Sequence, residues 1–90
     1  MKHQETNERD SGALALAALG WVLEDQSRAE RLLALTGLSP EGLRDGLSDS
    51  RLLAAIIRFL EAHEPDLVAC AEHLAIRPEV LVSARRLLES

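Results

Sequence analysis

All three prolines of the chain stand where a helix can begin, and this feature constrains the fold more than any other. At Ser39-Pro40-Glu41 the hydroxyl can cap a free backbone N–H, the proline has no N–H to satisfy, and the carboxylate meets the positive end of the helix. Pro65 and Pro78 likewise precede segments with helical spacing. No segment shows the apolar and polar alternation of a strand. The sequence therefore predicts an all-α fold.

Apolar spacing divides the chain into a compact bundle of about six short helices. The helix that Ser48 or Asp49 can cap is expected to be the longest, because its apolar residues recur at helical steps as far as Leu60. Gly37 suits a left-handed cap at the end of the second helix. The expected helices are about 11 to 24, 27 to 36, a short one from 40, 49 to 63, 65 to 74 and 78 to 88.

The first helix is expected to be central, because the run 13–23 is apolar nearly all round. Asp10 or Ser11 should cap it. The residues expected to be buried outside the 49–63 helix are Leu14, Leu16, Leu19, Trp21, Val22, Leu23, Ala29, Leu32, Leu33, Thr36, Leu67, Cys70, Ala71, Leu74, Val80, Leu81, Ala84, Leu87 and Leu88.

Ninety residues suffice for one domain, predicted over residues 10–90 after a disordered N-terminal tail over residues 1–9. The apolar run 13–23 is shorter than the roughly 20 residues that cross a bilayer, and no positively charged leader precedes it. The single cysteine, Cys70, cannot form an internal disulfide. We therefore expect a cytoplasmic protein with no membrane association.

An internal offset of 38 residues superimposes two parts of the chain. It places the segment 38–43 on 76–81, and Trp21 on Phe59, which are the only aromatic residues. Two three-helix halves that share one core would explain this match. Two unrelated Pro-Glu helix starts that fall into register by chance would explain it as well, so both interpretations stay open.

Side chains that could carry chemistry are few and poorly grouped. Cys70 and His73 lie one helical turn apart and His63 could supply a third metal ligand, but no fourth ligand has a recognisable spacing. A buried cysteine and a histidine at a helix C-terminus explain these residues better. Acidic pairs fall at helix ends, where capping accounts for them: Glu24 with Asp25, and Asp45 with Asp49. We expect no catalytic residue, no metal ligand, no cofactor-binding residue and no cofactor, and hence a protein that is not an enzyme.

A helix-turn-helix nucleic-acid binder is the alternative function. Ala71, Ala75, Ile76 and Leu81 follow the packing and turn pattern of that motif, and the helix from Pro78 would then enter the major groove. The residues near DNA would be Arg77, Glu79, Val82, Ser83, Arg85 and Arg86. However, 15 acidic against 10 basic side chains give a net charge of −5, which repels phosphate. Nucleic acid is therefore the less favoured partner.

Surplus apolar residues favour a protein partner. Of the residues outside the simplest apolar stripes, four are large: Leu35, Leu47, Ile57 and Val82. Surplus apolar surface is typical of proteins that bind a partner or self-associate. The sequence therefore predicts a protein-interaction or regulatory accessory module without catalytic activity.

The chain also resembles a known family over residues 13–88. The resemblance rests on four segments: 14–22, Arg31-Leu32-Leu33-Ala34-Leu35-Thr36-Gly37-Leu38-Ser39-Pro40-Glu41, 52–60 and Pro78-Glu79. Together they resemble the bacterial domain-of-unknown-function family DUF 3572, whose members are short helical proteins largely from alphaproteobacteria. Where members often have an acidic third-helix cap, this chain has Ser39, which caps equally well. The resemblance implies a cytoplasmic, all-helical bacterial protein and implies no catalytic residue, cofactor or partner.

Overall fold

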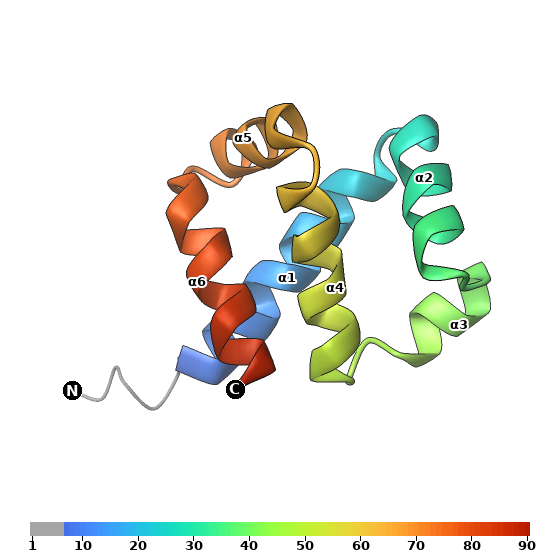
Figure 1. Cartoon of the computed structure of the whole chain (residues 1–90), viewed down its shortest axis with the longest axis horizontal. Coiled ribbons are helices and arrows are strands. Elements are labelled where there is room, and N and C mark those ends of the chain that lie inside the picture. Colours follow the sequence, from blue (N-terminus) through green and yellow to red (C-terminus); the bar gives the residue numbers. More distant parts are fainter. Residues whose placement is uncertain (1–6) are drawn as a thin grey trace.

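The computed structural model describes residues 7–90, which form six helices and no strand (Figure 1). The predicted all-α fold is confirmed. The helices are α1 (Asn7–Leu23), α2 (Gln26–Thr36), α3 (Pro40–Asp45), α4 (Ser50–Glu61), α5 (Glu64–His73) and α6 (Pro78–Glu89).

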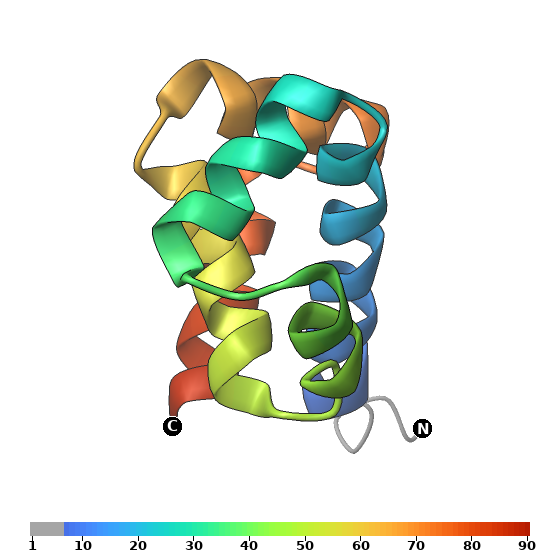
Figure 2. The same cartoon turned by 90° about the vertical axis from the view of Figure 1, so that its right-hand side faces the viewer.

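The core is built around α1 and α4. Each packs against α2, α5 and α6 as well as against the other, so the central position predicted for the first helix is confirmed. In Figure 1, α5 and α6 lie on one side of this pair, and α2 and α3 lie on the other. Figure 2 looks onto the second side, where α2 lies above α3. The fully buried large side chains are Leu32, Ile56, Ile57, Leu60, Leu81, Val22 and Cys70.

The predicted start of the first helix is wrong. α1 begins at Asn7, so Asp10 and Ser11 lie inside the helix, and Ser11 is 2% exposed. A helix that packing has already nucleated adds further residues at little cost, and serine and aspartate oppose a helix interior only weakly. The predicted tail, 1–9, lies outside the described residues except for 7–9, which are helical. With 17 residues, α1 rather than the 12-residue α4 is the longest helix.

The caps around α2, α3 and α4 form as the sequence predicts. Gly37 takes φ 73° and its N–H donates to the Leu33 carbonyl, which closes α2 with a left-handed residue. The Ser39 hydroxyl accepts a hydrogen bond from the Gly42 N–H at 3.0 Å, ahead of Pro40. Asp49, one of the two expected candidates, caps α4. These caps fix the path of the chain around α3.

The turn between α5 and α6 is closed by two backbone hydrogen bonds. The Ile76 N–H donates to the Ala71 carbonyl at 2.9 Å, and the Ala75 N–H donates to the Glu72 carbonyl at 3.1 Å. This is the Schellman pattern, which places one residue in the left-handed region. That residue is Ala75, with φ 61°, and it is the one described non-glycine residue with positive φ.

The helix bounds agree with the 38-residue offset without establishing a repeat. α2 and α5 begin at Gln26 and Glu64, and α3 and α6 begin at Pro40 and Pro78. The halves pack differently, however, since α6 has 12 residues and packs on α1, α4 and α5, whereas α3 has 6. The internal repeat stays a prediction.

Candidate protein-interaction surface

Leu35 is the most exposed large apolar residue in the described part of the chain, at 67%. It lines two surface depressions of about 410 and 540 Å³. Phe59 of α4 lines both depressions too, although it is only 6% exposed. We call their combined lining the Leu35 surface: Arg31, Ala34, Leu35, Thr36, Leu38, Leu52, Ala55, Arg58, Phe59, Ala62 and His63.

The ionisable residues that line the Leu35 surface are two arginines and a histidine. Arg31 Nη2 lies 3.0 Å from Asp66 Oδ2, and the guanidinium carbon of Arg31 lies 5.5 Å from the centre of the Phe59 ring. Arg58 makes a two-point ion pair with Glu89. The side chains of Arg31 and Arg58 are still 46% and 60% exposed, so both can reach a further ligand.

Asp66 holds the α5 side of this surface in place. Its carboxylate accepts from Arg31 and lies 3.1 Å from His63 Nδ1. Burial alone would raise the pKa of Asp66, but the hydrogen bonds from Arg31 and His63 outweigh burial and leave that pKa lowered. The carboxylate is therefore charged at neutral pH and orients Arg31.

A second exposed apolar surface runs along the outer side of α1, and it carries no charged side chain. Leu16 and Leu23, expected in the core, are 43% and 47% exposed. Ala13 and Gly20, three or four residues from these leucines, are exposed as well, and so is Ala17, which is four residues from Ala13 and three from Gly20. A Cβ atom on Gly20 would meet no atom within 4 Å. Residues 11–23 contain no charged side chain, so this outer face of α1 is apolar throughout.

Of the other three surplus residues, one is buried and two are half-buried. Ile57 is fully buried, so its assignment to surplus surface is wrong, because α4 has helices on several sides. Leu47 and Val82 are half-buried. Leu87, expected in the core, is 40% exposed. Leu35 is thus the member of the set that best fits a binding surface.

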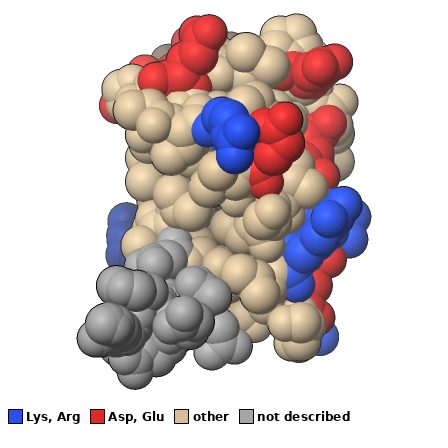
Figure 3. All heavy atoms as spheres, turned by 90° about the vertical axis from the view of Figure 1, so that its left-hand side faces the viewer, with Lys and Arg blue, Asp and Glu red and all other residues tan. Residues whose placement is uncertain are grey.

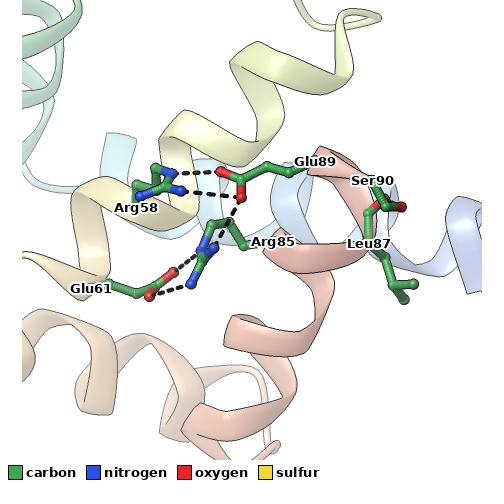
Figure 4. Close-up of polar contacts among 6 residues, drawn as sticks. All are labelled: Arg58, Glu61, Arg85, Leu87, Glu89 and Ser90. Carbon is green, nitrogen blue, oxygen red and sulfur yellow. Dashed lines mark hydrogen bonds and ion pairs between the residues drawn. The ribbon is translucent and has the colours of Figure 1, made fainter.

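An ion-pair network joins α4 to α6 (Figure 4). Arg85 makes two hydrogen bonds to Glu61, at 2.7 and 3.1 Å, and one to Glu89 at 3.0 Å. Arg58 completes the network through Glu89. The hydrogen bonds from Arg58 and then Arg85 lower the pKa of Glu89 below its ordinary value. The Arg85–Glu89 pair has the four-residue spacing of neighbours on one helix, but the contacts between α4 and α6 have no sequence signal, because their partners lie 24 and 31 residues apart.

The network also bears on the helix-turn-helix alternative. Arg85, placed near phosphate in that interpretation, is held by two carboxylates and its side chain is 15% exposed. Figure 3 shows the side of the molecule that carries α5 and α6, where positive and negative side chains are mixed and no continuous basic area is visible outside the grey atoms. The described atoms on this side therefore form no basic face of the kind that a phosphate backbone binds.

The candidate metal ligands do not converge. Cys70 is buried, whereas His63 and His73 are exposed at opposite ends of α5. Burial raises the pKa of the Cys70 thiol to about 11, against a smaller lowering effect of the Arg28 charge. Within residues 7–90 no group of three or more His, Cys, Asp or Glu side chains is placed to hold a metal ion.

The acidic pairs at helix ends act as caps in part. Asp25 accepts from the Arg28 N–H at 3.0 Å and caps α2, and Asp49 accepts from the Arg51 N–H and caps α4. Glu24 and Asp45 are on the surface. The expected structural role is confirmed for Asp25 and Asp49.

Sequence reasoning missed the contact that holds the turn between α1 and α2. The guanidinium carbon of Arg28 lies 3.6 Å from the centre of the Trp21 ring, and Arg28 Nη2 donates to the Trp21 carbonyl at 2.7 Å. Arg28 Nε is buried and has no acceptor among residues 7–90, which is unfavourable for a polar atom. No spacing rule pairs residues seven apart across a turn.

Fold and surface together define a small all-helical domain with exposed apolar faces. None of its described helices is long and apolar enough to cross a membrane. The chain belongs to the family described as "Protein of unknown function (DUF3572)", which matches residues 8–90. The family resemblance seen in the sequence is thereby confirmed. No curated protein and no solved structure matches the chain significantly.

Proposed function

We propose that this protein is a non-catalytic interaction module that binds a segment of a partner protein at the Leu35 surface. The observation that carries the proposal is the 67% exposure of Leu35 on a helix whose neighbouring surface is apolar on both sides. Complete burial of a leucine side chain contributes about 1.5 to 3 kcal/mol of favourable free energy. Because Leu35 is exposed in the isolated domain, it can contribute this free energy only when a partner covers it. A contiguous apolar surface of this kind is typical of interaction sites.

The frame around Leu35 favours binding without rearrangement. Gly37 and the Thr36 hydroxyl, which donates to the Leu32 carbonyl at 2.9 Å, fix the end of α2 next to Leu35. On the facing side Phe59 is anchored in the core of α4. A preformed surface loses little conformational entropy on binding, so more of the contact energy contributes to affinity.

The test is a selection of helical peptides from an unbiased display library on the immobilised protein. Peptides selected on the wild type are measured against Leu35→Glu and against Leu87→Glu, which places the same charge on another exposed leucine. We expect Leu35→Glu to raise Kd by about tenfold or more, equivalent to about 1.4 kcal/mol, and Leu87→Glu to leave it unchanged. Binders that tolerate Leu35→Glu would place the site elsewhere.

Self-association through the outer face of α1 is a second candidate, favoured by the absence of charge along residues 11–23. Two copies that each carry a net charge of −5 repel one another, so they meet most easily where no charge is present. In an antiparallel pair of α1 helices, Leu16 of one copy can lie against Gly20 of the other, and Leu23 against Ala13. Large residues then face small ones on both sides of a two-fold axis.

Sedimentation equilibrium over a range of protein concentrations tests this candidate. We expect a monomer–dimer equilibrium that Leu16→Glu shifts to monomer and that Leu35→Glu leaves unchanged. A wild-type chain that stays monomeric at millimolar concentration would contradict self-association while leaving the Leu35 surface as the binding site.

A further inference from the structure

We propose that the segment bound at the Leu35 surface is an amphipathic helix that places apolar side chains on both sides of Leu35 and acidic side chains against Arg31 and Arg58. This inference rests on the proposed function and adds the chemistry of the partner.

The charge of the surface is the first reason. Its ionisable lining residues are Arg31, Arg58 and His63, and no carboxylate lines either depression. The whole chain has the opposite balance, with 15 acidic and 10 basic side chains. The ionisable side chains that line the Leu35 surface are therefore all basic on an acidic molecule, with Asp66 and Glu89 paired to the two arginines outside the lining, and electrostatic complementarity favours acidic side chains of a partner there.

The second reason is that both arginines keep free hydrogen-bond donors. Arg58 uses Nε and Nη2 for Glu89, and Arg31 uses Nη2 for Asp66. The structure gives the remaining nitrogens no acceptor within residues 7–90, while each guanidinium has five N–H donors. A carboxylate of the partner can bind these donors without breaking the existing pairs.

The existing pairs also position the arginines. Asp66 and Glu89 each hold a guanidinium beside the depressions but do not line them. Exposed ion pairs of this kind contribute little to stability, so a partner can bind the same arginines without destabilising the fold. The two arginines are thus oriented before the partner arrives.

The shape of the surface indicates a helix. The described residues form no strand, so an extended segment has no sheet edge to join. Polyproline segments bind grooves lined by aromatic side chains, whereas the one aromatic residue in the Leu35 surface is the buried Phe59. The walls are the side chains of α2 and α4, between which a third helix can pack its apolar face. Apolar residues three and four apart on that helix would lie on either side of Leu35.

The experiment uses the same peptide selection and determines how many acidic and basic residues the selected peptides contain. We expect peptides whose binding depends on Leu35 to be enriched in Asp and Glu beside the apolar positions. Arg31→Gln and Arg58→Gln should each raise Kd by roughly three- to tenfold, since each removes one charge-assisted contact. Arg77→Gln and Arg86→Gln, which remove the same charge from exposed residues outside the Leu35 surface, are the matched controls.

Changes in the peptide keep the test independent of the folding of the variants. Replacing the acidic residues of a selected peptide with Gln should weaken binding to the wild type, and added salt should do so too. Leu35-dependent binders rich in Lys or Arg, or unaffected by Arg58→Gln, would overturn the acidic partner but keep the proposed function. A selection that yields no Leu35-dependent binder would overturn both.

Discussion

At the residue scale, two helix ends use the same left-handed conformation with different residues. Gly37 ends α2 at φ 73°, and Ala75 follows α5 at φ 61°. Glycine reaches this region without strain, whereas a Cβ atom in the left-handed region costs roughly 1 to 2 kcal/mol. Ala75 therefore stores strain that the packing of Ile76 and the two turn hydrogen bonds hold in place.

Exchanging the two residue types should change stability in opposite directions. We expect Ala75→Gly to raise the free energy of unfolding by about 0.5 to 1 kcal/mol, because relief of strain exceeds the extra entropy of the unfolded glycine. Gly37→Ala should lower it by about 1 kcal/mol, although its Cβ would meet no atom within 4 Å. Urea denaturation measures both. An Ala75→Gly variant less stable than the wild type would show that this turn is unstrained.

Exposure of single residues was only partly predictable. Apolar spacing treats Leu35 and Ile57 alike, yet one is 67% exposed and the other is fully buried. The difference arises because α4 has α1, α2, α5 and α6 around it, whereas α2 packs mainly on α1 and α4. A single sequence gives the apolar stripe of a helix but not which parts of that stripe the neighbouring helices cover, so Leu16, Leu23 and Leu87 were expected in the core although they are exposed.

At the element scale, local signals predicted most helix bounds. Four helix ends lie within one residue of their predicted places. They are the end of α2 at its glycine, the start of α3 at Ser-Pro-Glu, and the starts of α5 and α6 at their prolines. These signals act through hydrogen bonds of the adjoining backbone, so neighbouring residues suffice to predict them. The N-terminus of α1 was missed because no local stop signal opposes its extension to Asn7.

The cap of α3 can be compared directly with that of α6. Ser39 caps its helix through the hydroxyl, whereas Arg77 stands at the same place before α6 and makes no side-chain cap hydrogen bond. We expect Ser39→Ala to lower the free energy of unfolding by about 0.5 to 2 kcal/mol and Arg77→Ala to lower it by less. Thermal or urea unfolding checks the order. Equal losses would mean that the hydroxyl contributes nothing at this cap.

At the scale of the whole molecule, stability depends on the shared core of α1 and α4. Ile56 is fully buried, whereas Leu33 packs at the margin of the core and is half-buried. Ile56→Ala should cost about 2 to 5 kcal/mol, a large part of the stability of a small domain, and Leu33→Ala should cost less. Urea midpoints of the two variants give the comparison. A larger loss for Leu33→Ala would place the centre of the core between α2 and α3.

For the proposed interaction surface, the sequence predicted the type of function but not the residues that form the surface together. Surplus apolar residues predicted a protein-binding function, and Leu35 belongs to the proposed site. Its other components were not predictable, because Arg31 and Leu35 on α2 come together with Arg58 and Phe59 on α4 only through the packing of the two helices. The basic residues in the lining of this surface are opposite in sign to the net charge of −5, so composition alone does not suggest the acidic partner that we propose.

Acid should weaken the connection between α4 and α6. The pKa of Glu89 is lowered in the folded chain by Arg58 and Arg85, so the carboxylate binds its proton less readily than in the unfolded chain. Its contribution to stability is therefore complete above the ordinary glutamate pKa and is lost as the pH falls through the lowered folded value. The lowered pKa of Asp66 acts in the same direction on the contacts between α5 and α2.

Removing the titrating group should flatten this dependence. We expect Glu89→Gln to be less stable than the wild type at neutral pH and to lose less stability between about pH 5 and about pH 3, since one linked proton is absent. Urea midpoints at several pH values measure the slopes, and Glu79→Gln is the matched control, because Glu79 is exposed on the first turn of α6 and forms no ion pair with another residue of 7–90. Parallel slopes for the wild type and Glu89→Gln would show that Glu89 binds its proton equally well in the folded and unfolded chains, and that its pairs with Arg58 and Arg85 do not hold α6 to α4.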